Sequence, residues 1–193
     1  MNVGKVSKRV EQVFPFYVMD IMEKAKALEE QGENVVHMEV GEPDFPTPEP
    51  ILKAAQGFLE KGDVHYTKAQ GLPALRKKIA RYYRDEYNVD LSPERIFITP
   101  GASGALTVAL ASLIDAGDEV LTCDPGYPCN NNIVTLFGGQ PTSINVGEEH
   151  GFQLTGQLIA QAWSKATRGV MMASPSNPTG ATVNFDQLQN IVQ

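Results

Sequence analysis

The stretch GVMMASPSNPTG, residues 169–180, governs how the rest of this sequence is interpreted. Its first five residues form a short apolar run, which is typical of a buried strand. The next seven residues contain two prolines and a glycine, which interrupt helix and strand alike and therefore predict a rigid loop. Asn184 then fits a helix N-cap, and Gln187 three residues later completes the pattern of a capping box. The sequence thus predicts a loop that joins the carboxyl end of a buried strand to a helix.

A loop in this position is a candidate binding site, because ligands of open α/β sheets bind beyond the carboxyl ends of the strands. Asn177 places an amide side chain at its centre, with a proline directly after it. An ordinary strand-to-helix turn explains the same residues equally well, so the loop alone does not decide between the two interpretations.

Outward from this loop, the second half of the chain alternates strand and helix. We expect strands at 96–99, 119–122, 141–146 and 169–173, and helices at 105–113, 127–137, 154–165 and from Phe185 onward. The first half predicts helices over 17–31 and 50–61, a short strand at 35–38, and a long helix opened by residues 71–73. The alternation predicts an α/β fold with three layers, in which helices cover both faces of a mainly parallel sheet.

Composition excludes several classes of protein. Apolar residues make up 42% of the 193 residues, too many for a disordered chain, and the net charge of −7 argues against a nucleic-acid or anionic-membrane surface. No apolar stretch has the length of a transmembrane helix, and no apolar region follows the basic N-terminus, so we expect neither a membrane span nor a signal peptide. Cys123 and Cys129 form no Cys-x-x-Cys pair and no cluster with histidines, which indicates free thiols in a reducing cytoplasm and no metal site.

A second candidate site lies in the segment TPGASGA, residues 99–105, where small residues stand between a predicted strand and a predicted helix. Backbone N–H groups at a helix N-terminus attract anions, and the small side chains of Gly101 and Ala102 would let a phosphate approach. The Ser103 hydroxyl could add a hydrogen bond. A tight turn between strand and helix accounts for the glycines equally well.

Three further residues are candidates. Tyr127, in DPGYP at 124–128, follows a strand, and its ring could either stack on a flat cofactor or cap the core. Gly41 opens a proline-rich loop and permits close backbone approach, as a substrate carboxylate would require. Tyr66 lies between two helices and by itself indicates nothing.

Taken in order, these motifs resemble those of the class I/II aminotransferases, the pyridoxal-phosphate enzymes of fold type I. The resemblance rests on GEPDFPTP at 41–48, YTKAQGLPALR at 66–76, GDEV at 117–120 and SPSNPTG at 174–180. It extends from Phe14 to the end of the chain, and the last motif is the most specific.

The resemblance implies a role for each matched residue. Gly101, Ala102 and Ser103 would hold the phosphate of pyridoxal 5'-phosphate. Tyr127 would lie against the pyridine ring, and Asn177 would hydrogen-bond its phenolic oxygen. Gly41 would present its backbone N–H to the substrate carboxylate, and Tyr66 would reach the cofactor of a partner subunit, so that a homodimer shares its active sites.

The family is roughly twice as long as this chain, and the resemblance implies its N-terminal half, with residues 1–45 as an arm and part of the small domain and residues 46–193 as half of the large cofactor-binding domain. The family's Schiff-base lysine comes later in its pattern, so no catalytic residue is assigned here. Lys165 follows Ser164, as the family lysine can follow a serine, but it precedes the Asn177 loop, and we interpret it as a surface residue.

The resulting hypothesis is a cytoplasmic aminotransferase acting on an α-amino acid and a 2-oxo acid. One alternative is a C–S lyase or another carbanion enzyme of the same superfamily, because its cofactor loops would look alike. Another is a non-catalytic fragment that lacks the lysine. The sequence does not identify the amino-acid substrate.

Overall fold

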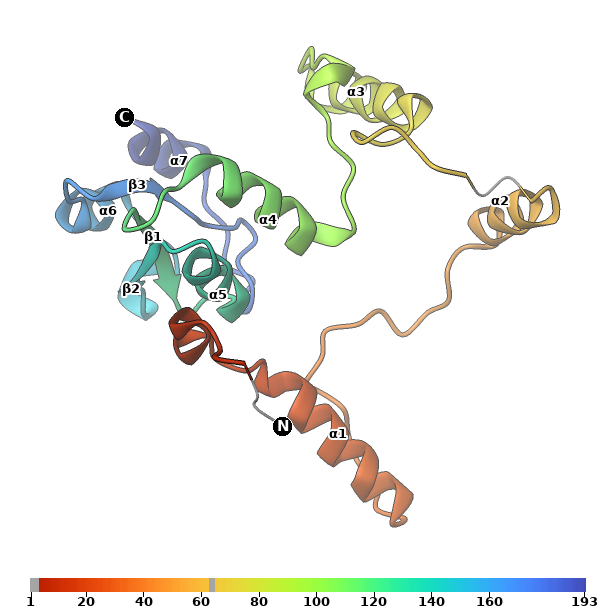
Figure 1. Ribbon diagram of the computed structural model, residues 1–193, viewed down its shortest axis with the longest axis horizontal. Helices are drawn as coiled ribbons and strands as arrows, with labels where there is room; N and C mark the ends of the chain where they lie inside the picture. Colours follow the sequence, from red (N-terminus) through yellow and green to blue (C-terminus); the bar gives the residue numbers. More distant parts are fainter. Residues whose placement is uncertain (1–3, 63–64) are drawn as a thin grey trace. The chain divides into compact units, whose positions relative to one another are not determined.

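The computed structural model describes residues 4–62 and 65–193 (Figure 1). The chain divides into two units. One unit comprises Met1–Phe16 and Gly101–Gln193, and the other comprises Tyr17–Pro100. Residues 1–3 of the predicted arm lie outside the described residues. We call the unit that contains Gly101–Gln193 the sheet unit and the unit Tyr17–Pro100 the helical unit.

Three parallel strands form the sheet, in the order β2-β1-β3. They are β1 (Glu119–Asp124), β2 (Gln140–Asn145) and β3 (Thr167–Val170). At the middle of the central strand, Leu121 lies opposite Thr142 on β2 and Val170 on β3. The predicted parallel α/β fold is therefore confirmed.

Two separate apolar clusters show that the sheet is covered on both faces. Val120 packs with residues of α4 (Gly101–Leu113) and α5 (Pro128–Leu136), among them Leu110, Ile133 and Val134. Leu121, the next residue of β1, packs with Val146, Leu154, Ile159 and Ile191, which include residues of α6 (Gly156–Ala162) and α7 (Phe185–Val192). Because successive side chains of a strand point to opposite faces, the two clusters lie on opposite sides of β1.

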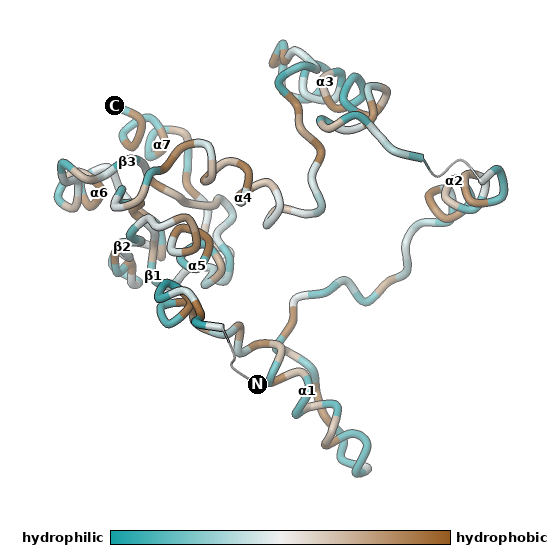
Figure 2. The backbone as a smooth tube through the Cα atoms, viewed as in Figure 1, coloured by the Kyte–Doolittle hydropathy of each residue, from teal (hydrophilic) through white to brown (hydrophobic). Residues whose placement is uncertain are grey.

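Local sequence signals explain where these helices begin. In α7, the Asn184 side chain accepts a hydrogen bond from Gln187 N, and the Gln187 side chain accepts one from Asn184 N, each 2.9 Å long. This is the predicted capping box. Thr155 caps α6 through a 3.2 Å bond from Leu158 N. Helix α4 carries no charged residue and is coloured white to brown along its length in Figure 2, as its packing against the sheet requires.

The N-terminal segment docks on α5. After the short helix η1 (Lys8–Gln12), Phe14 and Asn132 form two hydrogen bonds. Phe14 N donates to Asn132 Oδ1 at 3.2 Å, and Asn132 Nδ2 donates to the Phe14 carbonyl at 2.8 Å. Arg9 Nη1 donates to the Leu136 carbonyl at 2.7 Å. These bonds hold residues 9–14 against a helix more than a hundred positions away in the chain.

The helical unit contains α1 (Tyr17–Glu30), α2 (Glu49–Glu60), α3 (Pro73–Tyr87) and the short helix η2 (Pro93–Arg95). Arg76 on α3 is buried, and its Nη1 donates to the Gln70 side chain at 3.1 Å and to the Pro93 carbonyl at 3.0 Å. Ile98 N donates to the Gln70 carbonyl at 3.0 Å. Arg76 therefore ties the segments before and after α3 together.

Several predicted boundaries are also corrected. The strands predicted at 35–38 and 96–99 are not strands: within the described residues neither joins a ladder, and Val36 and Met38 are 77% and 88% exposed. A β-strand forms only when its backbone pairs with a neighbouring strand, and an apolar run in the sequence does not show whether such a neighbour exists. Helix α4 begins at residue 101 instead of 105, β3 ends at 170 instead of 173, and α6 covers 156–162 instead of 154–165.

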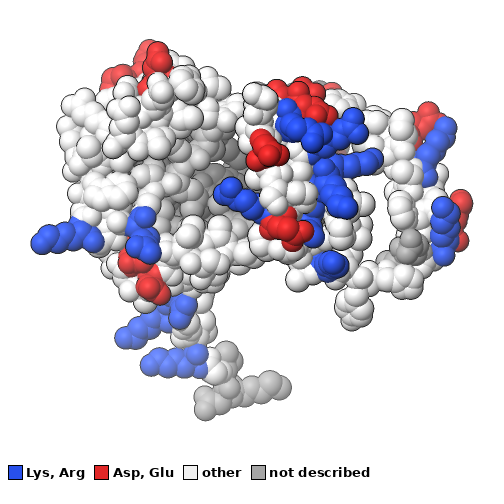
Figure 3. Space-filling view, turned by 90° about the horizontal axis from the view of Figure 1, so that it is seen from above, with Lys and Arg blue, Asp and Glu red and all other residues white. Residues whose placement is uncertain are grey.

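Charged side chains of both signs lie beside one another on the face shown in Figure 3. Over the whole sequence acidic residues outnumber basic ones, with a net charge of −7. None of the helices among the described residues is both long and apolar enough to cross a membrane.

Candidate functional site

Three of the predicted site segments point to one edge of the sheet. Because the strands are parallel, the chain leaves β1 and β3 at the same carboxyl edge, toward Tyr127 and Asn177 respectively. Helix α4 ends near the opposite edge, where Arg168 Nε at the start of β3 donates to the Leu113 carbonyl at 3.3 Å. Its N-terminus, at Gly101, is therefore directed toward the carboxyl edge.

The N-terminus of α4 has the properties of an anion site. Gly101 has φ +73°, a left-handed conformation that favours glycine, and Ala102 and Ser103 are exposed. The first turn, Gly-Ala-Ser-Gly, carries no side-chain charge. The positive end of the dipole of this 13-residue helix therefore has no acidic side chain in the first turn that would repel an anion.

Tyr127 begins α5 as its N-cap residue and is half-buried. Its ring lies edge-on to Phe16, with the ring centroids 5.8 Å apart and the planes at 78°. A hydrogen bond with the Cys129 thiol, together with burial, raises the pKa of Tyr127, so the phenol stays protonated at neutral pH. The ring is thus held in place from one side by Phe16, a contact that the sequence did not predict.

Beneath Tyr127 a cavity of about 230 Å³ opens at the carboxyl ends of β1 and β2. Three of the polar side chains that line it bind one another: Thr122 Oγ1 donates to Asn131 Oδ1 at 2.9 Å, Asn131 Nδ2 donates to Ser143 Oγ at 2.9 Å, and the two hydroxyls are 3.1 Å apart. This triangle fixes α5 to both strands. Each residue sits on a different element, so no local motif could have revealed it.

The Ser174–Gly180 loop has its own hydrogen bonds. Ser176 is buried; its N–H donates to the Ala181 carbonyl at 2.8 Å, and its carbonyl accepts from Gly180 N at 2.7 Å. Ser174 Oγ accepts from Val183 N at 2.9 Å. Between these fixed points Asn177 is exposed, so its amide is available to a ligand.

Gln153 closes the base of this loop and was missed by the sequence analysis. Its side chain is buried, with 3% of the residue exposed, and its Nε2 donates to the Ala173 carbonyl at 2.9 Å and to the Ala181 carbonyl at 2.7 Å. A single glutamine between a 3-10 turn and a helix gives no sequence signal of such a role.

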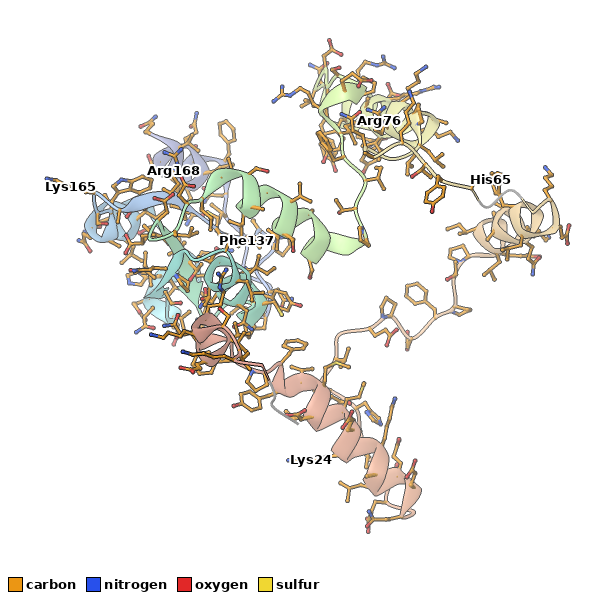
Figure 4. All side chains as sticks on the ribbon, viewed as in Figure 1. Lys24, His65, Arg76, Phe137, Lys165 and Arg168 are labelled. Atoms are coloured by element: carbon orange, nitrogen blue, oxygen red, sulfur yellow. The ribbon has the colours of Figure 1, made fainter. Side chains whose placement is uncertain are left out.

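Lys165 is exposed in the turn that precedes β3, at the amino edge of the sheet (Figure 4). It therefore lies at the edge opposite to the loops of Tyr127 and Asn177, which confirms its interpretation as a surface residue. Across the described parts of the chain, no three His, Cys, Asp or Glu side chains are grouped to hold a metal ion. Cys123 and Cys129 are free and half-buried.

Gly41 and Tyr66 belong to the helical unit. Gly41 is exposed in a segment without regular secondary structure, and Tyr66 is fully exposed in the segment between α2 and α3. Their predicted contacts with a substrate carboxylate and with a partner's cofactor stay predictions.

Comparison with known proteins places this architecture in a family. The sequence model for "Aminotransferase class I and II" matches residues 33–193. The (5-formylfuran-3-yl)methyl phosphate transaminase of Methanocaldococcus jannaschii is 40% identical over 93% of this chain and 46% of its own length. The aspartate aminotransferase of Thermotoga maritima is 36% identical over 97% of this chain and 50% of its own.

Solved structures of aminotransferases also match the fold of this chain. An aminotransferase from Mycobacterium tuberculosis has a TM-score of 0.92 at 35% identity, with 98% of this chain and 48% of that chain covered. The aspartate aminotransferase from Thermus thermophilus with maleate has a TM-score of 0.92 at 31% identity, covering 98% and 50%. The chain spans about half the length of the relatives it matches, and over that span it belongs to the class I and II aminotransferase family.

Proposed function

We propose that the full-length protein is a pyridoxal-phosphate-dependent aminotransferase that moves an amino group from an α-amino acid to a 2-oxo acid. One observation carries the proposal: the segments that bear Tyr127 and Asn177 both leave the parallel sheet at its carboxyl edge, and α4, whose C-terminus lies at the amino edge, begins with Gly101, Ala102 and Ser103. An anion site, an aromatic platform and an amide donor are the groups that a phosphorylated, aromatic, phenolic cofactor needs.

The residues present fit this cofactor. Gly101, Ala102 and Ser103 would bind its phosphate at the uncharged first turn of α4. Tyr127, braced by Phe16, would orient its ring, and the exposed amide of Asn177 would donate to its phenolic oxygen. When bound, pyridoxal phosphate accepts the electron pair left after a proton leaves the α-carbon of the amino acid. This chain's residues would bind and orient the cofactor for that chemistry.

The remaining parts of the proposal follow the family. Gly41 would present its backbone N–H to the substrate carboxylate, and Tyr66 would reach the cofactor phosphate of a partner subunit, so that the working form is a cytoplasmic homodimer. We propose the division into an arm with part of the small domain at 1–45 and half of the large domain at 46–193. The lysine that binds the cofactor covalently is not assigned to this chain.

Cofactor titration tests the proposal. The protein should show a saturable visible absorption band with pyridoxal phosphate. Asn177→Ala removes a hydrogen bond to a charged oxygen, worth about 1.5–3 kcal/mol, and should weaken binding roughly 10- to 100-fold. Asn190→Ala, which removes an exposed amide on α7, is the matched control and should bind as the unaltered protein does.

The reaction is assayed separately. Amino transfer that depends on an added 2-oxo acid supports the aminotransferase. Release of pyruvate and ammonia from a cysteine conjugate, without such transfer, would assign a C–S lyase instead. A spectrum at saturating cofactor that equals the spectrum of free pyridoxal phosphate would refute both enzymes.

A further inference from the structure

We propose that Gln153 is a positioning residue for Asn177: it clamps the two ends of the Ser174–Gly180 loop and thereby sets where the Asn177 amide lies. The inference deepens the proposed function and rests on it for the part that concerns the cofactor. Gln153 itself contacts no ligand, because it is buried behind the loop.

The geometry of the clamp is specific. The carbonyls that Gln153 Nε2 binds, those of Ala173 and Ala181, belong to the residues directly before and directly after the loop. Both N–H groups of the Gln153 amide therefore bind the two ends of the same loop. Since both partners are carbonyl oxygens at 2.7 and 2.9 Å, only the NH₂ end of the amide can face them, and the orientation of the side chain is fixed.

The Ala181 carbonyl has a second role. It also accepts the N–H of Ser176, and the Ser176 carbonyl accepts the N–H of Gly180. Gln153, Ala181, Ser176 and Gly180 thus form one connected set of hydrogen bonds around Asn177. A shift of the Ala181 carbonyl would therefore also move Ser176, the residue directly before Asn177, because Ser176 N is bonded to it.

The other end of the side chain supports a role beyond stability. Gln153 Oε1 is buried and has no hydrogen-bond partner among the described residues. An unsatisfied buried acceptor costs free energy, so an apolar residue would serve packing alone better than glutamine does. The two N–H groups at the loop, which an apolar residue lacks, are what the glutamine supplies.

The first test is amide hydrogen exchange on the protein as its gene encodes it, without added cofactor. Gln153→Glu keeps the size of the side chain but replaces both donors by a carboxylate that repels the two carbonyls. Gln153→Met removes the donors without adding charge. Both variants should speed exchange at the amides of Ser176 and Gly180 by about tenfold or more, while amides of β1 keep their protection.

Gln161→Glu, on the exposed face of α6, is the control and should leave these amides unchanged. Unchanged exchange in both Gln153 variants would overturn the clamp. Loss of protection throughout β1 in both would make Gln153 a general core residue and would equally overturn the positioning role.

The second test reads the position of Asn177 through the cofactor. A donor to the phenolic oxygen stabilises its ionised form, so losing the donor raises the midpoint pH at which the visible band changes. We expect an upward shift of about one to two pH units for Asn177→Ala, from loss of one hydrogen bond to a charged group. Gln153→Met should shift the midpoint in the same direction.

The double variant separates positioning from a merely structural effect. If Gln153 acts through Asn177, adding Gln153→Met to Asn177→Ala should leave the midpoint where Asn177→Ala alone places it. Fully additive shifts would overturn the inference. A protein that binds no pyridoxal phosphate would refute the proposed function, and hydrogen exchange would then decide the clamp on its own.

Discussion

Gly126→Ala should loosen the turn that carries Tyr127. A Cβ atom on Gly126 would fall inside van der Waals contact with the Cys123 carbonyl oxygen and would lie 3.3 Å from both the carbonyl carbon and Sγ of Cys123. The obstacle is backbone of β1, which cannot rotate away as a side chain can. We therefore expect the cost of an overpacked site, about 1–3 kcal/mol of unfolding free energy.

Gly169→Ala is the matched control. Gly169 also lies in the sheet unit, on β3, but a Cβ atom there meets nothing within 4 Å and the backbone does not require glycine. Alanine should leave stability unchanged or raise it by about 0.5–1 kcal/mol, because it restricts the unfolded chain.

Urea unfolding followed by fluorescence measures the difference. Trp163 is the chain's single tryptophan and follows α6, so it reports on the sheet unit. With a urea dependence of about 2 kcal/mol per molar, the Gly126→Ala midpoint should fall by about 0.5–1.5 M. A midpoint equal to or above that of Gly169→Ala would refute the steric reasoning. Pyridoxal phosphate should also bind Gly126→Ala more weakly, because the added methyl group displaces Tyr127.

Two further predictions concern pH. Hydrogen bonds from Thr167, Thr142 and Ser164 lower the pKa of Glu119 from its ordinary value of 4.5, so the stability it contributes is present above pH 4.5 and is lost as the pH falls through the lower folded pKa. Urea midpoints should therefore fall less on acidification in Glu119→Gln than in the unaltered protein; equal falls would contradict this. Hydrogen bonds to Glu39 and Glu29 raise the pKa of His37 above 6.5, so these contacts favour the folded state below pH 6.5 and lose their effect as the pH rises through the higher folded pKa. The NMR titration midpoint of His37 should lie above 6.5 and should fall in Glu39→Gln, whereas a midpoint at or below 6.5 would show that the pair does not form.

Local signals were sufficient for most of the sheet unit. The alternation of apolar runs and helical stripes predicted parallel strands with helices between them, and the residues at 184 and 187 predicted the capping box that the structure contains. These features depend on residues within a few positions of one another. The same reasoning failed at 35–38 and 96–99, where an apolar run resembles a strand but joins no strand of the sheet within the described residues.

The candidate site likewise contains residues that the sequence predicts and contacts that it does not predict. Gly101, Ala102, Ser103, Tyr127 and Asn177 were predicted because each follows or ends a regular element at a recognisable loop. What holds two of them in place was not predictable: Phe16 braces Tyr127 from far along the chain, and Gln153 binds carbonyls 20 and 28 positions away. The sequence by itself determined the elements, the loops and the residue types that suit a cofactor, because periodicity and turn chemistry act locally. Only the tertiary structure decided which distant side chains hold those loops, because a buried hydrogen bond forms wherever folding brings its donor and acceptor together.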